Sequence, residues 1–264
     1  MTRERINVGG LLFDNVNMRE ALMQVQEKIE HSQLCTEESS LLMAANQDIF
    51  NHVGKYKNLS LDRLNRAFLI IPDGYSIILG AKYLGTPLKE RVAGPDLMNE
   101  FMVVSAQKGY RNFFLGAAEG VAAKMAENFL AKYPDLQISG VYSPPFGDFS
   151  EEEKSKIKNM INESNSDVLW VSFGCPKQEW WILEHEAELN VPVIAGIGAA
   201  FDFHSGNKKR APLFLQKLKL EWLFRLLQEP ARLWKRYFVG AKTYLGLLRK
   251  QKSVVLRKQK KHKH

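Results

Sequence analysis

The sequence predicts a doubly wound, Rossmann-like α/β fold with a mostly parallel sheet of about six strands and a basic helical C-terminal appendage. Along residues 1–206, short apolar runs alternate with helical patterns, which is typical of parallel strands covered on both faces by helices. Charge divides the chain: residues 207–264 hold 18 Lys and Arg against 2 Asp and Glu, whereas residues 1–206 hold 19 against 27. We therefore expect an α/β domain over residues 1–206, and a basic amphipathic helical appendage with a disordered tail over residues 207–264.

The elements of the α/β domain follow from apolar periodicity and from the residues that start helices. Asn17 is placed to cap the first helix, and Ser150 with Glu153 forms a capping box at the start of a later one. Gly94-Pro95-Asp96 is a helix start signal. The predicted strands or hairpins span residues 6–14, 40–45, 67–71, 112–115, 137–142, 167–172 and 191–197, and the main helices end near residues 84, 108, 133, 163 and 189.

Composition excludes several classes of protein. The N-terminus lacks the apolar segment of a signal peptide, and the longest nearly apolar run, residues 191–201, is too short to span a bilayer. We therefore expect a cytoplasmic protein. The two cysteines, Cys35 and Cys175, give neither a disulfide framework nor a zinc spacing. The histidines are scattered and no Asp-x-Asp occurs, so the sequence predicts no metal site.

Polar or glycine-rich residues follow five of the predicted strands. Because the carboxyl ends of parallel strands meet at one edge of a sheet, these residues should share one rim, where α/β folds bind ligands. They are Asn46, Asp73, residues 116–120, residues 174–179 and residues 198–202. One such strand end is ordinary turn chemistry, but five together predict a site.

Asp73 is the candidate that can present a carboxylate to the predicted crevice. It follows the buried strand at 67–71 and precedes a helix that starts at Tyr75, so its carboxylate can face the crevice. The alternative is a helix cap, since an aspartate before a helix accepts from free backbone amides. The residues alone leave both readings open.

Anion-binding candidates lie on the same rim. Gly116 and Gly120 bracket a strand-to-helix turn that could let the backbone approach a diphosphate, or could be an ordinary tight turn. Gln178 lies in the first turn of a helix, where free amides are available for recognition. Arg91 and Arg210 could balance a diphosphate leaving group, or form surface ion pairs.

The appendage interleaves Lys and Arg with large apolar residues such as Trp222, Trp234 and Phe238. This pattern predicts contact with an anionic membrane surface. Packing of the helices against the domain is the alternative. Nucleic-acid binding is a third interpretation, but no nucleic-acid motif is present, so we expect no nucleic-acid partner.

Taken together, the motifs resemble the WecG/TagA/CpsF family of bacterial glycosyltransferases (glycosyltransferase family 26), over about residues 6–238. The position two before Asn46, often threonine in the family, is Ala44, which removes a hydroxyl contact there. The matching motifs are Ala45-Asn46, Pro72-Asp73-Gly74, Glu90-Arg91-Val92-Ala93-Gly94-Pro95-Asp96-Leu97, Gly174-Cys175-Pro176-Lys177-Gln178-Glu179, Gly196-Ile197-Gly198-Ala199-Ala200-Phe201-Asp202, Arg210-Ala211-Pro212, Glu221-Trp222, and Glu229-Pro230-Ala231-Arg232 with Arg236.

The resemblance implies an inverting, metal-independent sugar transfer with no cofactor. The donor would be a UDP-sugar, with N-acetylmannosamine favoured, and the acceptor an undecaprenyl-diphosphate-linked GlcNAc-type sugar in cell-surface polymer synthesis. It implies that Asp73 is the general base. By the same resemblance, the substrate-binding residues are Asn46, Arg91, Gln178, Asp96, Gly116, Gly120, Asp202 and Arg210, and the leaving-group or membrane contacts are Arg225, Arg232 and Arg236.

The resemblance also implies a peripheral location on the inner face of the plasma membrane and leaves homo-oligomerisation open. Within the family, UDP-N-acetylmannosamine uronate and UDP-glucose are alternative donors. A nucleotide-dependent Rossmann oxidoreductase is an alternative of another class, and it would require the Gly-x-Gly-x-x-Gly motif that this chain lacks.

Overall fold

A six-stranded parallel sheet forms the centre of the molecule in the computed structural model, which describes residues 3–31 and 40–261. The strand order is β4-β3-β8-β7-β5-β6, and every pairing in this sheet is parallel. The strands are β3 (Leu41–Ala45), β4 (Leu69–Pro72), β5 (Arg111–Gly116), β6 (Gln137–Tyr142), β7 (Val168–Ser172) and β8 (Val193–Gly196). The predicted α/β class and mostly parallel sheet are confirmed.

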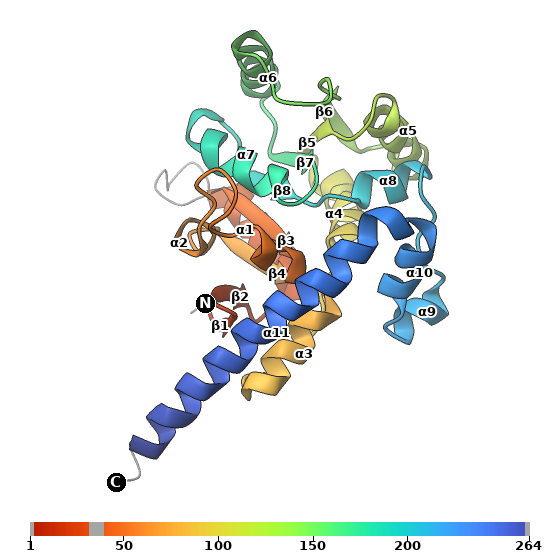
Figure 1. Ribbon diagram of the computed structural model, residues 1–264. Helices are drawn as coiled ribbons and strands as arrows, with labels where there is room; N and C mark the ends of the chain where they lie inside the picture. The colour runs from red at the N-terminus through yellow and green to blue at the C-terminus, as the bar shows by residue number, and fades with distance from the viewer. Residues whose placement is uncertain (1–2, 32–39, 262–264) are drawn as a thin grey trace.

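A separate antiparallel hairpin, β1 (Arg5–Val8) and β2 (Leu11–Asp14), lies beside this sheet (Figure 1). The α-helices are α1 (Met18–His31), α2 (Leu61–Leu64), α3 (Tyr75–Leu84), α4 (Gly94–Lys108), α5 (Val121–Lys132), α6 (Glu151–Glu163), α7 (Lys177–His185), α8 (Ala200–Ser205), α9 (Leu213–Lys217), α10 (Glu221–Gln228) and α11 (Pro230–Lys261). Two 3₁₀ turns, η1 (Gln47–Asn51) and η2 (Glu186–Glu188), complete the described elements.

Each face of the sheet has its own apolar core. Leu41 and Met43 of β3 enter one core, and Leu42 between them enters the other, because successive strand residues point to opposite faces. The first core includes residues of the hairpin, η1, α3, α6, α7 and α11. The second includes residues of α1, α4, α5 and α8. Helices thus cover both faces, as the alternating pattern predicted.

The predicted helix caps are present. The Asn17 side chain accepts from the Glu20 amide at 2.9 Å, and the Glu20 carboxylate accepts from the Asn17 amide at 2.9 Å. Ser150 Oγ accepts from the Glu153 amide at 3.2 Å. Each cap satisfies a donor that the first helical turn leaves free. The last strand is shorter than expected because Pro192 has no amide hydrogen to donate to a ladder.

The C-terminal segment is helical and packs against the α/β domain. Helix α11 runs 32 residues to Lys261, through a region where we expected a disordered tail, and it lies along α3 (Figure 1). The Tyr244 ring stacks on Phe50 of η1 at 5.3 Å, and the Tyr244 hydroxyl donates to the carbonyl oxygen of Ser76 at 3.1 Å. Further along, Gln251 accepts from the amide of Gly9 in the hairpin at 2.7 Å. Packing against the domain, the alternative we gave for the appendage, therefore holds for one side of this helix.

We predict that Gly80→Ala weakens the packing of α11. A Cβ added at Gly80 would lie 2.1 Å from the Tyr244 hydroxyl oxygen, so Tyr244 would have to move. Overpacking of this kind lowers the free energy of unfolding by about 1–3 kcal/mol. Denaturant unfolding measures it, with Gly246→Ala in α11 as the control, because a Cβ there meets nothing within 4 Å. A Gly80→Ala protein as stable as the control would contradict the close contact.

Candidate active site

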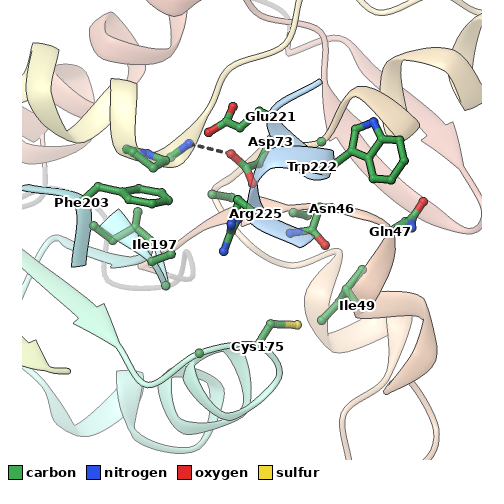
Figure 2. Close-up of a pocket in the computed structure, with 18 of the residues that line it drawn as sticks. Asn46, Gln47, Ile49, Asp73, Cys175, Ile197, Phe203, Glu221, Trp222 and Arg225 are labelled. Atoms are coloured by element: carbon green, nitrogen blue, oxygen red, sulfur yellow. Dashed lines mark hydrogen bonds between the residues drawn. The ribbon is translucent and has the colours of Figure 1, made fainter. Parts of the chain in front are cut away.

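A cavity of about 800 Å³ opens at the carboxyl ends of the central strands. Its floor is formed by residues that follow β3, β4, β5, β7 and β8, so all five predicted strand ends meet there. Its opposite wall comes from α10 and α11. Figure 2 shows side chains from both walls converging on it, with Arg225 of α10 close to Asp73 and Asn46.

Asp73 lines this cavity directly after β4. It does not cap α3, because the capping residue is Gly74 and no side chain caps that helix. Instead, Asp73 Oδ1 accepts from the amide of Gly94 at the start of α4, at 3.0 Å. One carboxylate oxygen is therefore oriented by the backbone. A carboxylate placed in this way can accept a proton from a bound hydroxyl group.

Arg91 links Asp73 to the appendage. Its Nε donates to the carbonyl oxygen of Asp73, and its Nη2 lies 4.0 Å from Asp73 Oδ1. The same Nη2 donates to Glu221 Oε2 of α10 at 3.0 Å. The guanidinium also lies 5.0 Å from the centre of the Tyr75 ring. Arg91 is therefore held on three sides within the cavity wall.

Glu221 is a functional candidate whose role we did not predict, although its motif was noted. It is 8% exposed and bridges two arginines, since Arg210 Nε donates to its Oε1 at 3.2 Å. Its partner Arg91 is far away in the sequence, so no local spacing could reveal the pair.

Arg210 and Asp96 do not line the cavity but pair with each other beside it. Two guanidinium nitrogens of Arg210 donate to the two oxygens of Asp96, one of them at 2.8 Å. Burial would lower the pKa of Arg210, but the hydrogen bond and charge of Asp96 outweigh burial and raise it. Burial would likewise raise the pKa of Asp96, but the hydrogen bond from Arg210 and the charges of Arg210 and Arg91 together outweigh burial and lower it. The pair joins the start of the appendage to α4.

Asn46 and Gln178 line opposite parts of the floor. The Asn46 side chain accepts from the Asp48 amide at 3.0 Å and so caps η1. Gln178 is 3% exposed, and its Nε2 donates to Glu179 Oε1 at 2.9 Å. Its Oε1 has no hydrogen-bond partner. A buried amide oxygen without a partner is costly, so it indicates a position where a ligand donor can bind.

Gly116, Gly120 and Asp202 were also predicted to bind the substrate, but only Asp202 lines the cavity. Gly116 and Gly120 do not line the cavity, although Ala117 and Ala118 between them do. At Gly116 a Cβ would lie 2.6 Å from the carbonyl oxygen of Ser172, so this glycine is needed for the approach of β7. Asp202 does line the cavity, and its Oδ1 accepts from the Asn207 amide group at 2.7 Å.

Cations from the appendage complete the cavity. Arg225 and Arg232, which the resemblance gave as leaving-group or membrane contacts, line it, and the side chain of Arg236 lies outside the described residues. Lys208 and Lys219 line it as well, and we did not predict them individually. The Arg225 guanidinium lies 5.5 Å from the Phe203 ring centre. A cavity with this many cations is suited to an anionic ligand.

Glu229 and Arg232 form a partly exposed pair at the edge of this cluster. Their shortest N–O distance is 2.5 Å, and Lys208 Nζ lies 3.1 Å from the other Glu229 oxygen. The hydrogen bond from Arg232 is the main reason that the pKa of Glu229 is lowered to about 2. Glu229 thus keeps its negative charge among these cations.

Within the part of the chain that the structure describes, no helix has the length and apolar character needed to cross a bilayer. Many of the exposed large apolar side chains lie between the start of α9 and the first half of α11. They are Leu213, Phe214, Leu218, Trp222, Leu223, Leu227, Trp234, Phe238, Val239 and Leu245.

Comparison with known proteins gives one consistent result. Residues 6–258 match the glycosyl transferase WecG/TagA/CpsF family. The chain is similar to the N-acetylglucosaminyldiphosphoundecaprenol N-acetyl-β-D-mannosaminyltransferases of Bacillus spizizenii (34% identical over 72% of both chains) and Bacillus subtilis (31% over 73% of both). The enzyme of the same name from Staphylococcus aureus is 27% identical over 88% of this chain and 86% of that one. With the family match spanning both the strand-end floor and the helical wall of the cavity, this chain belongs to the WecG/TagA/CpsF family of glycosyltransferases.

Proposed function

We propose that this protein transfers N-acetylmannosamine from a UDP-sugar to an undecaprenyl-diphosphate-linked GlcNAc, with inversion and without a metal ion. The observation that carries the proposal is the position of the Asp73 carboxylate, at the end of β4 in a cavity that Arg91, Arg225 and Arg232 also line. The names of the relatives from Bacillus and Staphylococcus support the sugar and the acceptor. UDP-glucose and the uronate remain the alternative donors to be tested.

In the proposed reaction, Asp73 removes the proton from the attacking hydroxyl of the acceptor sugar. The oxygen forms a bond to the anomeric carbon while the bond from that carbon to the β-phosphate oxygen breaks. The departing electron pair stays on UDP. Attack opposite to the leaving group inverts the anomer, so a single base is sufficient. Arg91, hydrogen-bonded to the Asp73 carbonyl oxygen and close to its carboxylate, would hold this base in place.

The negative charge that develops on UDP would be balanced by the appendage. Arg225, Arg232 and Lys208 line the cavity, and their charges can stabilise a diphosphate without a bound metal. Gln178 offers its unpaired buried oxygen to a donor on the sugar or the base. Asn46 and Asp202 supply further polar contacts, and Ala117 and Ala118 supply the backbone of the turn after β5.

The acceptor is attached to a lipid, so we propose that the protein works on the inner face of the plasma membrane as a peripheral protein. The exposed apolar residues of α10 and α11 lie beside basic residues, a combination that favours the interface of an anionic membrane. They also lie next to the cavity, which Trp222 and Phe238 line.

We predict that Leu227→Ser with Trp234→Ser weakens binding to anionic vesicles by at least about tenfold, because the apolar area that enters the interface is lost. These side chains are 74% and 57% exposed and do not line the cavity, so the fold and the pocket should persist. Vesicle co-sedimentation of the full chain measures the effect. Phe146→Ser, an exposed residue far from the appendage in sequence, is the matched control. Equal binding by the double variant and the control would contradict the proposed surface.

The function itself is tested by UDP release with a panel of UDP-sugars. The acceptor is a short-chain lipid-diphosphate-linked GlcNAc, and the buffer contains a chelator. We expect acceptor-dependent release from UDP-N-acetylmannosamine. Release from UDP-glucose or the uronate alone would change the donor, and silence with all donors would contradict the proposal.

A further inference from the structure

Three side chains with different metal-binding atoms meet beside the cavity. Asp48, His52 and Cys175 each offer one ligand atom, and these three atoms all lie within 4.8 Å of one another. Asp48 is buried, and the other two are half-buried. None of the three has a role in the proposed transfer.

We propose that Asp48, His52 and Cys175 form a binding site for a borderline-soft divalent cation, of which Zn²⁺ is the best fit. Thiolate and imidazole ligands select zinc over Mg²⁺ and Ca²⁺, which prefer oxygen. One sulfur, one nitrogen and one carboxylate oxygen make three of the four ligands of a tetrahedral zinc ion.

The spacing of the ligand atoms is near what such an ion needs. His52 Nε2 lies 3.7 Å from Asp48 Oδ2. Bond lengths of about 2.0–2.2 Å in a tetrahedral site put two such atoms about 3.3–3.6 Å apart.

The carboxylate of Asp48 is already oriented. Asn51 Nδ2 donates to Asp48 Oδ1 at 3.1 Å, and this oxygen is not the one that faces His52. Hydrogen bonds of this kind to a ligating carboxylate fix its direction and support metal affinity.

The cluster is accessible to an ion. Cys175 lines the cavity together with Gln47 and Ile49, and Figure 2 shows its side chain directed toward the segment of Ile49. The remaining coordination position can therefore be filled from the cavity by water or by an oxygen of a ligand. The proposed transfer runs through Asp73 and needs no ion here.

These ligands are not all close in the sequence, so no spacing in the chain predicted a metal site. Asp48 and His52 belong to the segment after β3, whereas Cys175 belongs to the loop after β7. The parallel sheet brings these two strand ends to the same edge, with β8 between them.

The test uses Co²⁺ as a spectroscopic substitute for Zn²⁺, with untagged full-length protein in a Cys35→Ser background so that Cys175 is its single thiol. We expect a thiolate-to-cobalt absorption band that saturates at one ion per chain and disappears when Zn²⁺ is added. Cys175→Ser should abolish the band. His52→Asn should weaken Co²⁺ affinity at least about tenfold. The exposed His31→Asn is the matched control and should bind as the parent does.

A second measurement does not depend on cobalt. Zn²⁺ should slow alkylation of Cys175, followed by mass spectrometry, in the parent and in His31→Asn but not in His52→Asn. Denaturant unfolding establishes that each variant is folded. Absence of the thiolate band in the folded parent would overturn the proposal. So would equal affinity and equal protection in His52→Asn, because the sulfur would then bind metal without the cluster.

Discussion

Asp73→Asn is expected to lower kcat for acceptor-dependent UDP release by about 10²–10⁴-fold. The amide of asparagine cannot take the proton of the acceptor hydroxyl. Its oxygen can still accept from the amide of Gly94, which Asp73 Oδ1 does at 3.0 Å, so the start of α4 should keep this bond. Steady-state kinetics with the lipid-linked acceptor measures the loss.

Two control measurements on this variant, its stability and its affinity for UDP, separate a loss of the base from a loss of the fold. The free energy of unfolding and the Kd for UDP should stay close to those of the wild type, since the substitution keeps shape and the bond to Gly94. A variant that turns over at a near-normal rate would return Asp73 to a structural role, holding the start of α4. A variant that fails to fold would call for Asp73→Ser, which retains an acceptor oxygen.

Glu221→Gln is expected to lower the free energy of unfolding by about 1.5–3 kcal/mol, because it removes the charge that pairs with two arginines. Glu221 is 8% exposed, and its oxygens lie 3.0 Å and 3.2 Å from nitrogens of Arg91 and Arg210. Arg91 should become less fixed beside Asp73, so kcat should fall as well. Denaturant unfolding and the UDP-release assay measure the two effects.

Glu229→Gln is the matched control for Glu221→Gln. It removes the same charge from the same appendage, but its side chain is 23% exposed, so water can replace part of the interaction. We expect a smaller loss of stability than for Glu221. Equal losses of stability in the two variants would show that the Glu221 bridge between Arg91 and Arg210 stabilises the protein no more than an ordinary surface ion pair.

Much of the α/β domain could be predicted because its signals are local. Apolar runs, the caps at Asn17 and Ser150, and the glycines at strand ends each depend on a few neighbouring residues. The meeting of Asn46, Asp73 and Gln178 in one cavity follows from parallel strands sharing an edge. The direction of each side chain does not follow from the strand order. For this reason the pairing of Asp96 with Arg210 beside the cavity was not predicted.

What could not be predicted depends on contacts between distant segments. The bridge from Arg91 to Glu221 joins the loop before α4 to α10. No helical or strand periodicity in the sequence could predict this contact. The contacts of α11 could not be predicted for the same reason. Tyr244 bonds to Ser76 and Gln251 bonds to Gly9, and both partners are distant in the sequence. The basic, polar character of the last dozen residues indicated a disordered tail when read alone, yet the described part of the chain is helical to Lys261.

The continuity of α11 connects the cavity to the N-terminal hairpin along a single helix. One helix, about 48 Å long at 1.5 Å per residue, carries Arg232 at the cavity, Tyr244 on α3 and Gln251 on the hairpin. If the proposed diphosphate binds only the position of this helix in which Gln251 accepts from Gly9, its binding and that hydrogen bond are coupled. By reciprocity, loosening the hairpin would then weaken diphosphate binding by the same free energy. Amide exchange at Gly9 would thus report occupancy of a cavity at the other end of the helix.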